Sequence, residues 1–151
     1  MQNLKILNSK EIKKIHSMLN ENFGFEEKLD YGFLANNKNK IYIINKDFAD
    51  IDIEKIRINS LGLYLGETYD NDIRLSIEGS QIIGKKAKKN VVELDKQETK
   101  DWLRGIDIEK ETGIRGFIIL KHNTDFLGCG KAVDKKILNF VPKNRRLKVN
   151  D

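Results

Sequence analysis

The sequence has little cysteine, proline or histidine, and it has no long apolar run. The one cysteine, Cys129, excludes an intrachain disulfide and a structural zinc site built from cysteines. No apolar run approaches the ~20 residues that cross a membrane, and no basic-then-apolar signal segment begins the chain. We therefore expect a soluble, cytoplasmic protein that makes no contact with a membrane.

The basic residues are distributed unevenly along the chain. Residues 1–59 carry a net charge of +1, and residues 60–151 carry a net charge of +4. Between residues 131 and 148, seven lysines and arginines stand against one acid, and apolar residues are interleaved with them. This pattern predicts a strand that holds its charges at fixed positions. Fixed positive charge on a folded domain favours a polyanion partner, most simply a nucleic acid.

The first 59 residues predict a small α+β unit. A helix begins after Asn8, which is placed to form a capping box with Glu11, and it ends at Gly24. Apolar residues recur along this helix at helical spacing. The remaining elements of the unit are two strands, at residues 31–34 and 40–44, and a short helix that begins at Asp50 or Asp52.

Residues 60–151 predict a second unit of short strands separated by turns. Two short helices interrupt the strands, one capped by Ser76 and ending at Gly84, the other opened by the capping box of Asp95 and Glu98. The strands are expected at residues 61–66, 91–94, 116–121, 126–131 and 137–143. Strands of this length and spacing favour a small mixed β-barrel, so the expected fold class is α+β.

Several segments of the second unit occur in an order that is typical of a known family. They are the strand at 61–66, the helical segment at 74–84, Asp101-Trp-Leu-Arg-Gly-Ile-Asp-Ile108, Leu127-Gly-Cys-Gly-Lys131 and Leu138-Asn-Phe-Val-Pro-Lys-Asn-Arg145. Together they resemble the PUA-like RNA-binding domain found after the catalytic domain of Nop/Sun-type RNA cytosine-C5 methyltransferases. This resemblance covers roughly residues 61–146, and it implies RNA binding in tRNA or rRNA modification or in ribosome biogenesis.

The sequence also departs from these methyltransferases. It has no Pro-Cys motif and no glycine-rich dinucleotide-type loop, and only 60 residues precede the predicted barrel. The resemblance therefore implies a freestanding PUA-like domain with an N-terminal α+β extension, and it does not imply methyl transfer.

The candidates for RNA contact are basic, polar or glycine residues in loops and at strand ends. They are Arg74, Ser76, Lys85, Lys86, Lys88, Lys89, Gly128, Gly130, Lys131, Asn139, Lys143, Arg145 and Arg146. Guanidinium and hydroxyl groups can bind phosphate oxygens, and each lysine that neutralises a phosphate steepens the salt dependence of binding. We expect these groups to converge in one groove for structured RNA once the chain folds.

Most of these groups also have a structural interpretation. The lysine run at 85–89 is equally typical of a solvated loop. Gly128 and Gly130 interrupt a strand, which indicates a bulge or barrel corner, a close approach by a ribose-phosphate backbone, or both. Tyr69, in a predicted polar turn, is either an ordinary surface residue or one that stacks on a base.

Catalysis finds little support in the sequence. Cys129 can meet His122 only if the two approach across a hairpin, so a packed thiol is favoured and a Cys–His enzyme is the alternative. Trp102, the one tryptophan, is expected in the core. We expect no catalytic residue, no metal, no cofactor and no DNA partner.

The sequence thus predicts a non-catalytic protein that binds structured RNA, either tRNA or rRNA. The alternative is a protein–protein adaptor that docks onto a separate RNA-modifying enzyme or an assembly factor. An exposed apolar patch on the N-terminal unit would favour that alternative.

Overall fold

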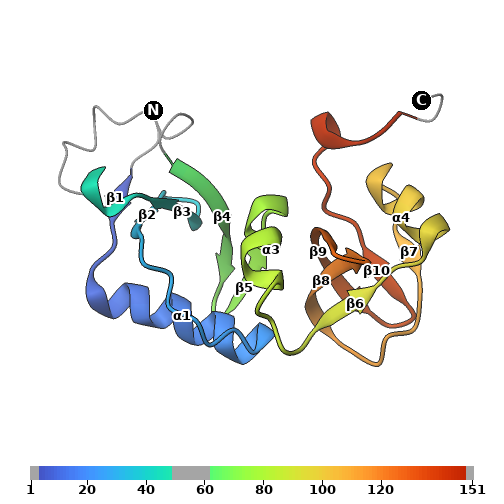
Figure 1. Ribbon diagram of the computed structural model, residues 1–151, viewed down its shortest axis with the longest axis horizontal. Coiled ribbons are helices and arrows are strands. Elements are labelled where there is room, and N and C mark those ends of the chain that lie inside the picture. The colour runs from blue at the N-terminus through green and yellow to red at the C-terminus, as the bar shows by residue number, and fades with distance from the viewer. Residues whose placement is uncertain (1–3, 49–61, 149–151) are drawn as a thin grey trace.

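The computed structural model describes residues 4–48 and 62–148, and its architecture is α+β, as predicted (Figure 1). Three α-helices and two five-stranded sheets make up this described part of the chain. The helices are α1 (Ser9–Phe23), α3 (Ile77–Gly84) and α4 (Lys96–Leu103), and the short 3-10 turns are η1 (Lys46–Phe48) and η3 (Lys143–Arg145). Each of these helices is too short or too polar to span a bilayer.

The first sheet is antiparallel throughout, with the strand order β1-β2-β3-β4-β5. Its strands are β1 (Lys5–Ile6), β2 (Gly32–Ala35), β3 (Lys40–Ile44), β4 (Gly62–Tyr69) and β5 (Asp72–Leu75). Helix α1 lies along this sheet and buries Ile15, Leu19 and Phe23 against it (Figure 1). These are apolar positions at the helical spacing that the sequence shows.

The second sheet has the order β6-β8-β9-β10-β7, and only its β6–β8 pair is parallel. Its strands are β6 (Val91–Glu93), β7 (Ile108–Glu109), β8 (Gly116–His122), β9 (Asp125–Val133) and β10 (Lys136–Leu138). Over the residues that the structure describes, β6 and β7 are the two edges of this sheet and do not pair. The predicted α+β class is thus confirmed, and the strands expected to form a small mixed β-barrel form a sheet that is not closed over these residues.

The helix ends follow the predicted local chemistry. The side chain of Asn8 accepts a hydrogen bond from the Glu11 N–H at 2.9 Å, and Glu11 accepts one from the Asn8 N–H at 3.0 Å. Asp95 and Glu98 exchange the same two bonds at the start of α4, at 2.7 and 2.9 Å. Gly24 ends α1 with a left-handed φ of 63°. All three local predictions are confirmed.

Strand pairing differs from the sequence-based expectation. We placed the strand at 61–66 at the start of the second unit, but β4 pairs with β3 and carries β5 with it into the first sheet. The chain passes from one sheet to the other between Leu75 and Val91, downstream of the expected division at residues 59 and 60. The helix expected from Asp50 or Asp52 lies outside the described residues.

The last predicted strand, at 137–143, is also shorter than expected, because pairing stops after Leu138. The next backbone N–H, of Asn139, donates to the carboxylate of Asp107 at 2.8 Å. The N–H of Val141 donates to the side chain of Asn139 at 2.7 Å, and Pro142 has no N–H to offer. Hydrogen bonds to side chains thus replace the backbone hydrogen bonds of the sheet in this segment.

Strand β8 joins the two halves of the molecule because both of its faces are buried, as its apolar run predicts. Ile119 and its cross-strand partner Cys129 pack in the core shared with the first sheet. Ile118 and Leu120 point to the other side, into the core around Trp102, which is fully buried. The second sheet therefore packs on the first through one face and on α4 through the other.

Candidate nucleic-acid interface

Three aromatic side chains gather where the two sheets meet. The β4–β5 hairpin turns at Asp70 and Asn71, and Asp70 takes the left-handed φ of 52° that suits such a tight turn. Tyr69 therefore ends β4 with 43% of its surface exposed, and its ring lies 5.7 Å from that of Phe117 on β8. The ring of Phe140 lies 6.4 Å from Phe117 in an edge-to-face contact. We call these three rings the aromatic face.

Two cations lie over the aromatic face. The guanidinium of Arg74, on β5, is 4.6 Å from the centroid of the Phe140 ring and 5.8 Å from that of Tyr69. The ammonium of Lys131, on β9, is 5.8 Å from the centroid of Phe117, its cross-strand partner. These separations are in the range of cation–π contacts. Arg74 and Lys131 are both candidates from the sequence, and the fold brings them together.

The carboxylate of Glu67 limits the positive charge at this place. It accepts a hydrogen bond from the Tyr69 hydroxyl and lies 3.4 Å from a guanidinium nitrogen of Arg74. Burial, together with this hydrogen bond, raises the pKa of Tyr69, so the hydroxyl stays protonated at neutral pH. Lys131 is exposed and forms no ion pair with the residues described, so its charge is available to a ligand.

A cleft of about 120 Å³ opens beside the aromatic face, between the start of α3, the residues at 140–142 and β9. Arg74, Ser76 and Gly128 line it, so it brings three predicted site residues together. The hydroxyl of Ser76 is already used by the fold, because it accepts from the Gly79 N–H at 2.8 Å and donates to the Tyr64 carbonyl at 2.5 Å. Its role here is to cap α3.

Arg145 of η3 reaches across this cleft to α3. Its guanidinium donates to both carboxylate oxygens of Glu78, at 3.0 and 3.1 Å, and these bonds raise the pKa of Arg145. Both side chains are partly exposed, so the pair contributes only about 0–1 kcal/mol to stability. Arg145 is thus positioned at the cleft but held by an acid. Lys143, on the same turn, is exposed, and its RNA contact stays a prediction.

The fold explains why glycine stands at positions 128 and 130. The register of β8 and β9 shifts so that Leu127 has no partner, and Gly128 takes a φ of 136°, which glycine adopts without steric cost. A Cβ on Gly130 would lie 2.7 Å from the ring of Trp102. The bulge predicted as one alternative is confirmed, and the approach of a ribose-phosphate backbone to Gly128 stays a prediction.

The side chains of Asn139 and Arg146 are engaged in the fold. The amide nitrogen of Asn139 donates to the carbonyls of Trp102 and Ile106, at 2.9 and 3.0 Å. The Nε of Arg146 donates to the carbonyl of Val141 at 2.9 Å. The bonds of Asn139 hold the segment after β10 against the end of α4, and the bond of Arg146 lies within that segment. We leave both residues out of the proposed interface.

The four lysines at 85–89 lie in the turn between α3 and β6 and are exposed, as predicted. Lys86 lies 3.9 Å from Glu27, and Lys88 lies 3.0 Å from Glu26, both acids of the segment that follows α1. Because these pairs are exposed, each is weak and leaves the lysine able to exchange its partner for a phosphate.

The other two lysines of this turn, Lys85 and Lys89, form no ion pair within residues 4–48 and 62–148. They border a polar recess of about 290 Å³ together with Lys88 and Asn90. Lys121, at the end of β8, lines the same recess, and sequence reasoning did not single it out because it stands at the end of a strand. We call this feature the lysine recess.

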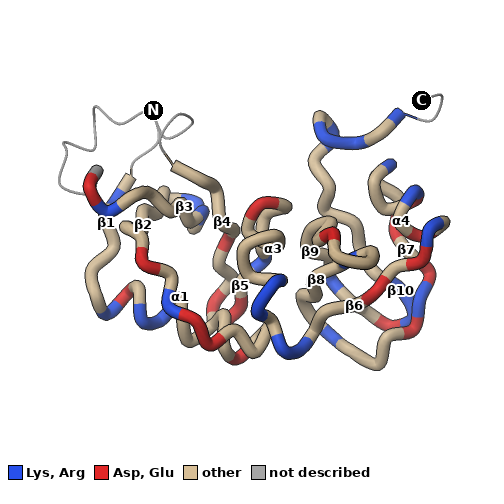
Figure 2. The backbone as a smooth tube through the Cα atoms, in the orientation of Figure 1, with Lys and Arg blue, Asp and Glu red and all other residues tan. Residues whose placement is uncertain are grey.

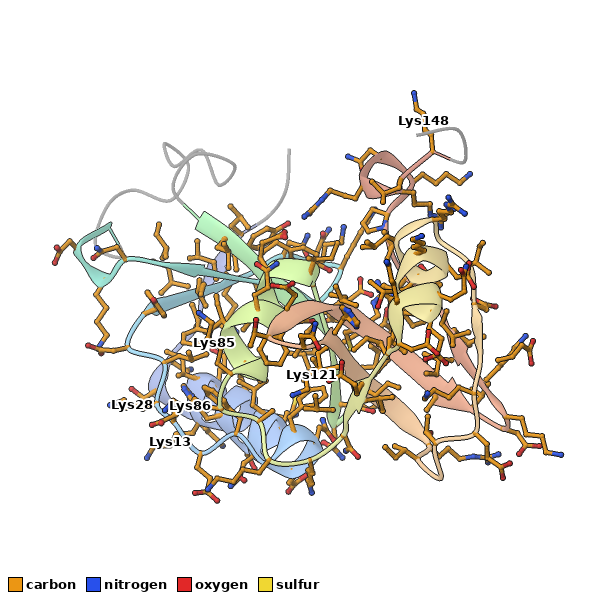
Figure 3. The ribbon with its side chains drawn as sticks, turned by 45° about the vertical axis from the view of Figure 1, so that its right-hand side comes forward. Lys13, Lys28, Lys85, Lys86, Lys121 and Lys148 are labelled. Atoms are coloured by element: carbon orange, nitrogen blue, oxygen red, sulfur yellow. The ribbon has the colours of Figure 1, made fainter. Side chains whose placement is uncertain are left out.

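The predicted cations do not converge in one groove, because the cleft and the lysine recess lie at opposite ends of α3. Figure 2 shows the basic α3–β6 turn below α3 and the basic C-terminal segment well above it. Figure 3 likewise places Lys85 and Lys121 far from Lys148. A helix of eight residues is ~12 Å long, so one RNA strand is able to reach both places, but no single phosphate can.

Cys129 and His122 do not meet. Cys129 pairs with Ile119, three residues along β8 from His122, which is about 10 Å at ~3.3 Å per residue. The imidazole of His122 instead bonds the carbonyl of Leu94 at 2.8 Å. Burial raises the pKa of the Cys129 thiol to about 12. This geometry excludes the Cys–His pair that the sequence left open.

The buried thiol gives a testable expectation. Because burial moves the pKa of Cys129 from 9.0 to about 12, its thiolate fraction at pH 8 falls about 1,000-fold. A thiol reagent should therefore label the native protein at least ~1,000-fold more slowly than the urea-unfolded chain. The labelling is measured by absorbance. Rapid labelling of the native protein would show that the thiol is accessible and ionised.

Residues 89–147 match the family model described as the methyltransferase RsmF PUA domain, so this part of the chain is similar to that PUA domain. The resemblance recognised in the sequence is thereby confirmed. The aromatic face draws Phe117, Lys131 and Phe140 from the matched segment, and Tyr69 and Arg74 from the strands before it.

The similar proteins are ribosomal RNA small subunit methyltransferases F. The protein of Aeromonas salmonicida is 30% identical over 139 residues, which is 91% of this chain and 28% of the relative. The protein of Aeromonas hydrophila is 28% identical over 113 residues, 74% of this chain and 24% of the relative. That of Vibrio vulnificus is 27% identical over 89 residues, 59% of this chain and 19% of the relative. The chain thus spans less than a third of the length of these relatives.

Proposed function

We propose that this chain is an RNA-binding module that acts in ribosomal RNA modification and binds single-stranded RNA on the aromatic face. The observation that carries the proposal is the position of Arg74 and Lys131 over three aromatic rings at the edge of a cleft. Stacking on aromatic rings and guanidinium planes is how proteins bind unpaired bases, and a neighbouring cation binds the phosphate that follows.

The small size of the cleft favours separate places for the base and for the sugar or phosphate of one nucleotide. Its volume of about 120 Å³ is below the ~300–1,000 Å³ of sites that enclose a whole small molecule. A base would therefore lie on the exposed ring of Tyr69 while the cleft accepts a sugar or phosphate edge. Arg145 stands at the cleft to bind that phosphate once it leaves Glu78.

The RNA class and the absence of catalysis rest on different support. The names of the similar proteins refer to ribosomal RNA of the small subunit, which favours rRNA over tRNA. For a non-catalytic role, the support is that Cys129 is buried and separated from His122.

A matched pair of oligonucleotides, one RNA and one DNA, tests the proposal by fluorescence anisotropy. Binding of RNA is expected, and an RNA affinity no higher than that for DNA would contradict it.

Glu78 is expected to compete with RNA for Arg145. The Glu78→Gln variant removes the negative charge from the cleft and frees the guanidinium, which exchanges its bidentate partner for a phosphate. RNA affinity should rise about fivefold near 0.1 M salt, and the slope of log K against log salt should steepen by about 0.7.

The exposed Glu111, for which the structure gives no role, provides the matched control. The Glu111→Gln variant makes the same change in net charge away from the cleft and should leave affinity nearly unchanged. An equal rise in both variants would show that net charge, and not release of Arg145, controls binding.

A further inference from the structure

The lysines of the α3–β6 turn continue onto the N-terminal unit. Figure 3 shows Lys13 and Lys28 beside Lys86, with Lys85 next to them and Lys121 across the turn. They come from α1, from the segment after α1, from the α3–β6 turn and from β8. We call these five side chains the lysine belt.

Backbone and side-chain contacts hold the two parts of the belt together. The N–H groups of Lys88 and Lys89 both donate to the carbonyl of Phe23, at 2.8 and 3.2 Å. The amide of Asn90 donates to the carbonyl of Asn22, one residue earlier on α1. The turn is therefore docked on the C-terminal end of α1, and its lysines keep a fixed place relative to the N-terminal unit.

His16 fixes the other junction, between α1 and the segment that carries Lys28. Its Nε2 accepts a hydrogen bond from the N–H of Leu29 at 2.9 Å, so Nδ1 carries the proton and donates to the carbonyl of Ile12 at 3.0 Å. Lys13 and Lys28 line one open groove of about 760 Å³ along this junction. The two lysines are thus presented on the rim of the same groove.

The belt has a strong excess of positive charge. Lys13, Lys28, Lys85 and Lys121 form no ion pair within the described ranges of the chain. The acids next to the belt are Glu26, Glu27 and Asp30. Each is already paired with a lysine, Glu26 and Glu27 with lysines of the α3–β6 turn and Asp30 with Lys46. The belt consists of lysines, whose flexible, charged ammonium groups bind phosphates well. They lack the fixed donor geometry that recognises base edges.

We infer that the lysine belt binds the sugar-phosphate backbone of a helical segment of the RNA whose unpaired end lies on the aromatic face. This inference rests on the proposed function, and it adds Lys13, Lys28 and Lys121 to the RNA contacts. The belt begins at the far end of α3, ~12 Å from the cleft, and extends away from it. Only an RNA longer than the cleft therefore reaches it.

The test compares two RNAs and three proteins. One RNA is a single strand of ~4 nucleotides, and the other is a hairpin of ~16 base pairs that ends in the same four nucleotides. The proteins are the parent chain, the Lys13→Gln/Lys28→Gln variant, and a control with Lys96→Gln and Lys100→Gln, two exposed lysines of α4. Anisotropy titrations at several salt concentrations give the affinity and the salt slope of each pair.

The Lys13→Gln/Lys28→Gln variant should bind the hairpin about tenfold more weakly near 0.1 M salt, with a slope smaller by about 1.5, and bind the short strand as the parent does. The control should match the parent on both RNAs. Parent-like hairpin binding by the Lys13→Gln/Lys28→Gln variant would overturn the inference about the lysine belt and leave the proposed function standing. That outcome is also expected if the groove binds a polypeptide in place of RNA. If the parent binds neither RNA, the proposed function itself fails.

Discussion

Replacing Arg74 by glutamine is expected to weaken the binding of single-stranded RNA about 30-fold. Arg74 lies over Phe140 and Tyr69, and it also neutralises Glu67. Its loss removes a charge-assisted contact, worth about 2 kcal/mol, and leaves an unpaired carboxylate beside the RNA. Isothermal titration with a short oligonucleotide measures the change directly.

The controls for this variant separate charge from stacking. The Lys100→Gln variant removes one positive charge on α4, away from the aromatic face, and should bind RNA as the parent does. The Phe140→Leu variant keeps the apolar volume but removes a ring, and should cost about 1–3 kcal/mol of binding. An Arg74→Gln protein with parental affinity would show that RNA binds elsewhere.

Gly79→Ala is expected to lower the free energy of unfolding by about 3 kcal/mol. Gly79 lies on α3 where the helix approaches β4, and a Cβ there would meet the carbonyl oxygen of Leu65 far inside van der Waals contact. That carbonyl already accepts from the Ser76 N–H at 2.9 Å, so a backbone shift also disturbs the helix cap. Overpacking against backbone costs more than overpacking against a movable side chain.

Urea or thermal unfolding followed by circular dichroism measures this effect. A loss of about 3 kcal/mol corresponds to a fall in Tm of roughly 6–12 °C for a chain of this size. Gln81→Ala, at an exposed position of the same helix, is the control and should change stability by no more than about 0.5 kcal/mol. Equal stability of the Gly79→Ala variant and the parent would show that α3 is free to move away from β4.

Local chemistry made much of the fold predictable from the sequence. The capping boxes at Asn8 and Asp95 need partners only three residues away, so a short window contains all the information. The apolar run at 117–120 predicted a strand buried on both faces for the same reason. The choice of sheet for β4 was not predictable, because its partner β3 lies about 20 residues upstream and both sheets offer an edge that an apolar strand could join.

The candidate site was predictable in its charges and not in its rings. Arg74 and Lys131 attract attention as cations near glycines and strand ends. Phe117 belongs to an apolar run that is typical of a core strand, although its half-buried ring forms part of the aromatic face. The pairing of Lys86 with Glu27 joins residues almost 60 positions apart, so the sequence could not show that acids lie among the lysines.

The most direct test of the central claim is photo-crosslinking of a 4-thiouridine oligonucleotide, followed by mass spectrometry of the attached peptides. If bases stack on the aromatic face, the label should fall on Tyr69, Phe117 or Phe140. Labelling confined to residues remote from that face, such as the β2–β3 loop or the exposed side of α4, would contradict the account.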